Sequence, residues 1–413
     1  MKKRKLLIGI ALILIAVYAL YMSQFRKSVA DAEPALQVKS ILESNDCLSC
    51  HSPKAELPFY ASFPLAGKLI KKDITNGLRY IDLEKICRQL EADGKVSEVD
   101  LAKIEQCMIS GSMPKLQYRL VHWGNTFNNK EKKALSSWIN STRNSLYPSP
   151  LAAEKFRNEP IRPVRDAIST DKKKVDLGYR LFHDTRLSAD NTVSCATCHD
   201  LKAGGVDGLK TSKGIYGQIG GINAPTVYNA ALNASQFWDG RAKDLQAQAG
   251  GPPLDALEMG SEWKDIIAKL SADEAISKDF AALYPEGITE NSITDAIAEF
   301  EKTLLTPDSR FDQYLKGNGS ALNREEIEGY RLFKRHNCAT CHGGENMGGV
   351  SYEHMGIVKD YFKDRGTPLH DNKDFGYFNV TKDSSDFQKF KTPSLRNIAL
   401  TAPYYHDGTI KTL

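Results

Sequence analysis

The sequence predicts a mainly helical protein that is built from several compact parts in series. Three observations lead to this prediction. Helical patterns recur along the chain, whereas the alternating patterns that are typical of strands are few. A five-residue segment is repeated 151 positions later. A second pattern, Cys-x-x-Cys-His, occurs three times at long intervals and has a chemistry of its own.

Each Cys-x-x-Cys-His motif places two thiols about one helical turn apart and a histidine directly after them. Such thiols can add to the two vinyl groups of a haem, whose iron the histidine then binds. Zinc sites pair two Cys-x-x-Cys knuckles a short loop apart, but here the gaps are 148 and 143 positions. A thioredoxin-like motif gives no reason for three copies. We therefore expect three c-type haems, bound through Cys47, Cys50 and His51, through Cys195, Cys198 and His199, and through Cys338, Cys341 and His342.

The N-terminus carries four positive charges in residues 1–5, followed by an apolar run over 6–22. As a helix this run spans about 26 Å, which is short but adequate for a bilayer core. The charges favour a cytoplasmic N-terminus. Small residues at 30–32 could form a signal-peptide cleavage site, but Arg26 and Lys27 intervene. We expect a single-pass transmembrane anchor in a bacterial inner membrane, with the haem domains in the periplasm.

Breaker residues divide the chain further. Tyr147-Pro148-Ser149-Pro150 is typical of a domain boundary. Before it we expect helices over 82–92, 97–108 and 129–143, the second capped by Ser97 with Asp100. The expected parts are an anchor and linker (1–34), an N-terminal haem domain (35–150), a second haem domain (151–315) and a third (316–413). The order of haem motif, Met-Pro pair and closing helix in the first haem domain resembles a small class I cytochrome c.

Met113 is the expected sixth iron ligand of the first haem. A haem that transfers electrons keeps six ligands, and methionine opposite histidine raises its potential. Met113 lies 62 positions after His51, in a loop before the closing helix. Its rival Met108 belongs to an apolar helix face, so we expect it in the core.

The repeated segment Gly-Tyr-Arg-Leu-Phe lies at 178–182 and at 329–333. Each copy falls in a helical pattern just ahead of a haem motif. We infer a duplicated helix that packs on its haem, and hence two related cytochrome c-like domains.

The net charge of +4 is spread thinly and gives no nucleic-acid footprint. Two thiols, Cys87 and Cys107, lie outside the motifs. A disulfide, which an oxidising compartment would allow, and two buried free thiols are both open.

Further motifs appear in a characteristic order. They are Leu-Ser-Ala-Asp (187–190), Gly-Gly-Val-Asp-Gly (204–208), Asn-Ala-Pro-Thr-Val (223–227), Gln-Phe-Trp-Asp-Gly-Arg (236–241), Thr-Pro-Asp-Ser (306–309) and Leu-Thr-Ala-Pro-Tyr (400–404). From about residue 155 onward the chain resembles the bacterial di-haem cytochrome c peroxidases. With its anchor and added haem domain it resembles the membrane-bound tri-haem quinol peroxidases over essentially its whole length.

The resemblance implies that peroxide is reduced at the second haem. Gln248 and Glu258 match the family's distal pair: Glu258 would move a proton between the peroxide oxygens while Gln248 orients it. Such a haem needs an open sixth position and an acid–base group. Many members carry a histidine after Thr-Ser-x-Gly that caps this iron, but here Ile215 follows that stretch. We therefore expect an iron that is already open in the oxidised state.

The resemblance also assigns an electron relay and a calcium ion. The third haem would be the high-potential relay, with Trp238 between it and the second haem. Asn223, Thr401 and Pro403 match positions that hold calcium between the domains, and hard oxygen ligands from irregular backbone suit that ion.

The third haem lacks an evident sixth ligand. Family members continue beyond Leu413 in a helical segment that carries the ligating methionine, so we expect that the sequence is truncated. Met347 is five positions from His342 and is expected on the wrong side of the ring, which leaves Met355 as a substitute.

Together these features predict reduction of hydrogen peroxide to water, with electrons entering at the first haem and passing through the third to the second. Membrane quinol is the expected donor, and a small cytochrome c is the alternative. A MauG-like oxidase that modifies a protein and a multi-haem electron conduit are the rival functions. A homodimer is open, and no nucleic acid partner is expected.

Overall fold

A computed structural model describes residues 2–25, 33–122, 125–357, 359–369 and 371–413. The chain divides into two compact units, Met1–Pro148 and Ser149–Leu413. The further division of the second unit into two haem domains stays a prediction.

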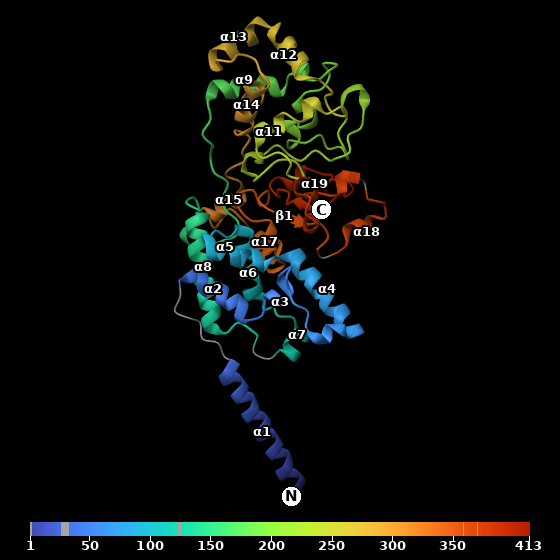
Figure 1. Ribbon diagram of the computed structural model, residues 1–413. Helices are drawn as coiled ribbons and strands as arrows, with labels where there is room; N and C mark the ends of the chain where they lie inside the picture. The colour runs from blue at the N-terminus through green and yellow to red at the C-terminus, as the bar shows by residue number, and fades with distance from the viewer. Residues whose placement is uncertain (1, 26–32, 123–124, 358, 370) are drawn as a thin grey trace. The chain divides into compact units, whose positions relative to one another are not determined.

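The first unit is built from helices (Figure 1). They are α1 (Lys2–Phe25), α2 (Pro34–Ser44), α3 (Leu48–His51), α4 (Pro64–Tyr80), α5 (Leu83–Ala92), α6 (Glu98–Ser110), α7 (Leu116–Val121) and α8 (Asn129–Leu146). Helices α5, α6 and α8 agree with the three predicted ranges to within three residues. The Ser97 hydroxyl accepts a hydrogen bond of 3.1 Å from the backbone N–H of Asp100, which confirms the predicted cap.

Helices α2, α5, α6 and α8 enclose the core of this unit. Val38, Leu101 and Ile139 are among its fully buried side chains. Cys87 is buried in the same core and Cys107 is half-buried, and both are free thiols. Of the two alternatives for these cysteines, the structure therefore has the unpaired one.

The expected membrane anchor is wrong. Among the described residues, no helix has both the length and the apolar character that a membrane span requires. The predicted inner-membrane location, which depended on this anchor, is overturned with it.

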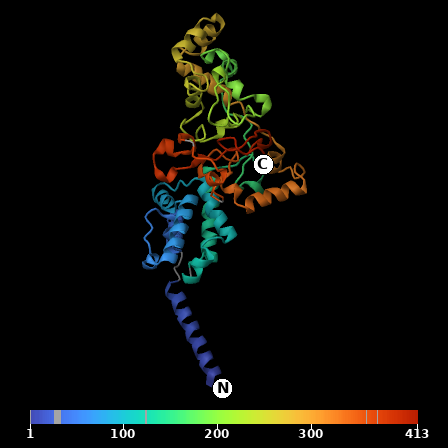
Figure 2. The same ribbon diagram turned by 90° about the vertical axis from the view of Figure 1, so that its right-hand side faces the viewer.

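The second unit combines helices with long ordered loops. Its helices are α9 (Lys172–Phe182), α10 (Cys195–Cys198), α11 (Leu245–Ala249), α12 (Trp263–Ser271), α13 (Glu274–Leu283), α14 (Glu290–Glu301), α15 (Arg310–Leu315), α16 (Arg324–Arg335), α17 (Cys338–Cys341), α18 (Tyr361–Arg365) and α19 (Phe378–Thr381). Two short strands, β1 (Tyr352–His354) and β2 (Lys389–Lys391), pair antiparallel with Tyr352 opposite Lys391. Figures 1 and 2 show that the green segment between α10 and α11 is mostly loop.

The two copies of the repeated segment form helices, α9 and α16, but these pack differently. In α9, Gly178 lies so close to α14 that a Cβ at this position would be 1.9 Å from the Ala296 carbonyl oxygen. In α16, a Cβ on Gly329 would meet no atom within 4 Å. The repeat thus predicts the two helices correctly, while the close helix contact belongs to the first copy.

Candidate haem sites and peroxidatic cavity

The three Cys-x-x-Cys-His motifs share one local structure. In each, a single helical turn, α3, α10 or α17, brings the two cysteines to the same side. A backbone hydrogen bond of 3.0–3.2 Å joins the histidine N–H to the carbonyl of the first cysteine. This turn is the arrangement that attachment to two adjacent vinyl groups requires.

The ring of each motif histidine is fixed by the backbone. His51 Nδ1 lies 3.1 Å from the Gly77 carbonyl, His199 Nδ1 lies 3.3 Å from the Gly205 carbonyl, and His342 Nδ1 lies 3.1 Å from the Met347 carbonyl. A ring that donates from Nδ1 is neutral with Nε2 available as an acceptor, and burial lowers the pKa of all three histidines. This is the orientation in which a histidine ligates iron, so the residues present fit the haem.

At the first motif, helix α4 approaches the haem-binding turn at a glycine. A Cβ on Gly77 would be 2.5 Å from the Cys50 carbonyl oxygen and 3.3 Å from His51 Cε1. Met113 lies in the loop between α6 and α7 and is 37% exposed, whereas Met108 is buried in the core as expected. The assignment of Met113 as iron ligand stays a prediction.

The second motif opens into a cavity of about 630 Å³. Cys195, Cys198 and His199 form part of its wall, and this volume is in the range of cofactor sites. The predicted residues Gln248, Glu258, Trp238 and Asn223 line the same cavity. The fold therefore brings together side chains that are up to 63 positions apart in the sequence.

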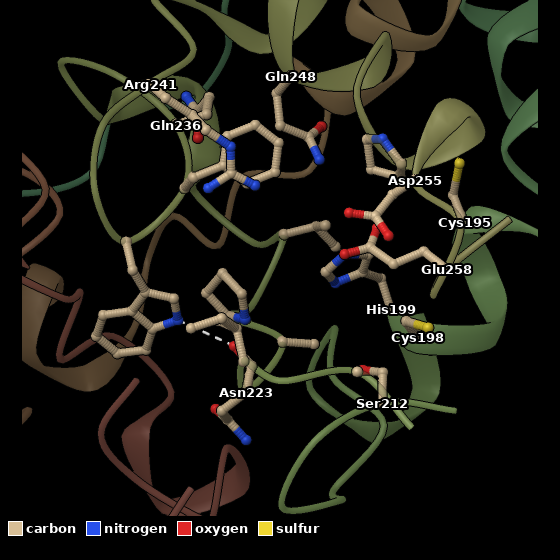
Figure 3. A pocket seen from close by; sticks show the side chains of 18 of the residues that line it. Cys195, Cys198, His199, Ser212, Asn223, Gln236, Arg241, Gln248, Asp255 and Glu258 are labelled. Carbon is tan, nitrogen blue, oxygen red and sulfur yellow. Dashed lines mark hydrogen bonds between the residues drawn. The ribbon is translucent and has the colours of Figure 1, made fainter. Parts of the chain in front are cut away.

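Glu258 is the cavity's most informative titratable group. Burial, together with the nearby Asp255 carboxylate, raises its pKa from an ordinary value of 4.5 to about 7, and Arg241 opposes the change. Figure 3 shows the Glu258 and Asp255 carboxylates together, with the Gln248 amide directed toward them from α11. A carboxyl group with this pKa can both accept and donate a proton at neutral pH.

Ile215, which stands where a capping histidine occurs in many members, is part of the hydrophobic core and is 3% exposed. Its N–H donates to the Glu258 carbonyl oxygen at 2.9 Å. Gly214 beside it leaves no room for a side chain, because a Cβ would be 1.9 Å from the Leu257 carbonyl oxygen. The loop that carries Glu258 is thereby packed onto this segment.

Trp238 is hydrogen-bonded to two different segments of the second unit. Its indole Nε1–H donates to the Asn223 carbonyl at 2.9 Å, and its own carbonyl accepts from the Lys391 N–H at 2.9 Å. Two residues after Lys391, the Pro393 carbonyl faces the His342 ring. The chain thus links Trp238 directly to the backbone that orients the third motif's histidine.

The residues proposed for calcium are brought partly together. The Asn223 N–H donates to the His406 carbonyl at 2.8 Å, which places Asn223 beside the segment that holds Thr401 and Pro403. The Asn223 Nδ2 donates to the Leu209 and Lys210 carbonyl oxygens. Within the described part of the chain no cluster of three or more His, Cys, Asp or Glu side chains could hold a metal.

At the third motif, Met347 contacts His342 through its backbone carbonyl, while its side chain packs against the cluster formed by Ile161, Leu315 and Tyr330. That Met347 lies on the wrong side of the ring to be the sixth ligand stays a prediction.

Sequence reasoning missed several titratable residues in the cavity wall, among them Asp255, Glu301 and Lys391. Asp255 precedes Glu258 by one turn of the loop, and Glu301 and Lys391 lie far away in the sequence. Glu301 and Lys391 are 4% and 8% exposed, although a charged side chain is normally expected at the surface. Only the fold shows that they face the cavity.

Comparison with known proteins shows the family to which this chain belongs. The family described as di-haem cytochrome c peroxidase matches residues 172–320, and a haem-binding domain family matches residues 7–141. The cytochrome c peroxidase Ccp of Escherichia coli (strain K12) is 46% identical over 402 residues, which cover 96% of this chain and 86% of that protein. The chain belongs to the di-haem cytochrome c peroxidase family. It binds haem and is a haem peroxidase.

Two further proteins extend the comparison of this peroxidase. The cytochrome c551 peroxidase of Nitrosomonas europaea is 45% identical over 261 residues, covering 62% of the chain and 75% of that protein. Among solved structures, a MauG-like protein associated with microbial copper homeostasis has a TM-score of 0.53 and 32% identity, covering 62% of this chain and 78% of that one.

Proposed function

We propose that this peroxidase reduces hydrogen peroxide to water in the cavity beside His199, with electrons relayed through three c-type haems. The observation that carries the proposal is the Glu258 carboxyl, whose pKa of about 7 suits proton transfer, in the wall that also contains Cys195 and Cys198. A conduit has no use for such a group, because electron transfer between six-coordinate irons moves no substrate proton.

The haem would supply the iron at which the O–O bond is cleaved and the electrons that the cleavage consumes. The chain itself handles the protons. The ionised Glu258 carboxylate accepts the proton of one peroxide oxygen and returns it to the oxygen that leaves as water. The Gln248 amide, which enters the cavity from α11, orients the peroxide between them. Burial and, second to it, the Asp255 charge keep the pKa of Glu258 high enough for the return step.

Electrons enter at the first haem and reach the second by way of the third. The loop that carries Met113 is accessible: Ile109 and Leu116 on either side of it are 74% and 63% exposed. Such a loop can receive a donor. Trp238, with its backbone contact to the segment that faces His342, joins the last two sites.

The donor is proposed as either a quinol or a small cytochrome c. The preference for a quinol came from the anchor, which the structure does not have among its described residues. Calcium at Asn223, Thr401 and Pro403 is retained as a proposal because irregular backbone and amide oxygens of this kind suit a hard cation.

The test begins with the purified full-length protein. Pyridine haemochrome analysis should give three haems per chain. Steady-state hydrogen peroxide consumption is then followed with a reduced quinol and, in parallel, with a reduced small cytochrome c. Turnover with either donor supports the proposal and identifies the donor. Two haems per chain would contradict the three-haem relay. Absence of turnover with either donor would contradict the peroxide chemistry.

One control addresses calcium and another the entry site. Turnover after chelation and gel filtration should fall and should return when calcium is added. Met113→Ala should slow reduction by the donor while leaving the reaction of the pre-reduced enzyme with peroxide unchanged. A MauG-like oxidase would instead consume peroxide poorly with both donors.

A further inference from the structure

A buried lysine in the cavity has no counter-ion. Lys391 is 8% exposed on strand β2, and its ammonium group makes no hydrogen bond or ion pair with the described residues. The acidic group that raises the pKa of Lys391 is Asp239, and the Asp239 carboxylate forms an ion pair of 2.9 Å with Arg241. Burial lowers the pKa of Lys391 to about 8, so the group is still mostly charged at neutral pH. A buried charge is costly unless it is paired.

The backbone of Lys391 is attached to the side of the cavity that lies opposite the cysteines. The backbone N–H of Lys391 donates a hydrogen bond to the Trp238 carbonyl oxygen. Trp238 lies in the segment between Gln236 and Arg241, which Figure 3 shows on the opposite side of the cavity from Cys195 and Cys198. The rim around Lys391 is basic as well, because the exposed Lys373 and Lys382 also line the cavity.

The two edges of a c-type haem match the two sides of this cavity. Its two vinyl groups, which become thioethers at the cysteines, are on one edge of the porphyrin, and its two propionates are on the opposite edge. A haem fixed at Cys195 and Cys198 therefore carries its carboxylates toward the basic side.

We infer that Lys391 is the binding site for a haem propionate, and that this ion pair directs the propionate edge toward Trp238. The inference rests on the proposed function, since it requires a haem at Cys195 and Cys198. Lys391 acts as a positioning residue: it touches the cofactor's carboxylate and not the peroxide. The pair also places a fixed positive charge beside the haem, which favours the ferrous over the ferric state.

Spectroelectrochemical titration of the full-length protein tests the inference. The wave of the second haem is identified as the one that is lost in a Cys195→Ser, Cys198→Ser variant. Lys391→Met should shift its ferrous-to-ferric equilibrium at least tenfold toward ferric, which lowers the potential by about 59 mV for one electron. Lys391→Arg, which keeps the charge, and Lys278→Met, which removes an exposed lysine of α13, should leave the wave in place. The propionate-bending bands in resonance Raman spectra should move in Lys391→Met alone.

Three results would overturn the inference. One is an unchanged potential and an unchanged Raman band in Lys391→Met with full haem content. Another is a wild-type potential that depends on chloride concentration, because that dependence would assign the lysine to a free anion. The third is loss of this haem from both Lys391→Met and Lys391→Arg, since either cation should hold a carboxylate; loss from Lys391→Met alone supports the inference. None of these readouts needs peroxide turnover, so failure of the proposed function is recognised separately, by absence of the haem or of turnover in the wild type.

Discussion

Replacement of Asp255 by asparagine should change the pH dependence of the peroxidase without removing its acid–base group. The pKa of Glu258 is raised from 4.5 to about 7, first by burial and second by the Asp255 charge. Asp255→Asn leaves the burial and removes the charge. We expect the pKa of Glu258 to fall by about one pH unit, which is about 1.4 kcal/mol.

The consequence can be measured as kcat/KM for hydrogen peroxide between pH 5 and pH 8.5. The free enzyme needs Glu258 ionised, so the wild-type value should rise with pH through about 7. In Asp255→Asn the same rise should occur at lower pH. At pH 6 the ionised fraction then increases from about one-tenth to about one-half, a gain of about fivefold in kcat/KM, while the values at pH 8 nearly coincide.

The matched control is Asp176→Asn, which removes an exposed carboxylate of α9 that does not line the cavity. This variant should reproduce the wild-type profile. An acidic limb that stays in place in Asp255→Asn, or that moves to higher pH, would refute the account of how Glu258 is tuned.

Other predictions concern stability, the first haem and the resting iron. Burial raises the pKa of Glu301 from 4.5 to about 8, so the folded state holds this proton more tightly and loses stability as pH rises through that window. Glu301→Gln should therefore raise the free energy of unfolding at pH 7 by on the order of 3 kcal/mol. Thermal melts of the wild type and of Glu301→Gln at pH 5 and pH 8 test this, and an equal pH dependence of the two proteins would contradict it. Gly77→Ala should push a methyl group into the Cys50 carbonyl, cost about 1–3 kcal/mol, and perturb only the first haem's spectrum; an unperturbed spectrum counts against the packing described. Because Ile215 is buried and cannot ligate, the resting enzyme should show a high-spin ferric signal in electron paramagnetic resonance, and a purely low-spin spectrum would exclude an open iron.

The sequence carried most of the information on covalent chemistry and little on the cavity's charges. Cys-x-x-Cys-His is a local pattern, so the turn that presents each pair of thiols follows from a few adjacent residues. Glu258 and Gln248 were found through ordered motifs, but the cause of the Glu258 pKa, a neighbouring Asp255 in an enclosed wall, depends on loop packing. Lys391 gave no signal because a lysine in a polar stretch reads as a surface residue.

The prediction of a membrane anchor was wrong because it, too, depended on the sequence pattern alone. An apolar run beside positive charges is a composition pattern, and composition alone does not establish a membrane span. Among the described residues, no helix combines the length and the apolar character of a membrane span.

The most direct test of the central claim is peroxide consumption by Glu258→Gln, which keeps the shape of the side chain and removes its acid–base chemistry. With haem content and donor reduction equal to those of the wild type, kcat/KM for hydrogen peroxide should fall by about 10²- to 10⁴-fold. Glu286→Gln, an exposed glutamate of the same unit, should have no effect. A Glu258→Gln enzyme with activity close to that of the wild type would contradict the claim that this carboxyl moves the proton between the peroxide oxygens.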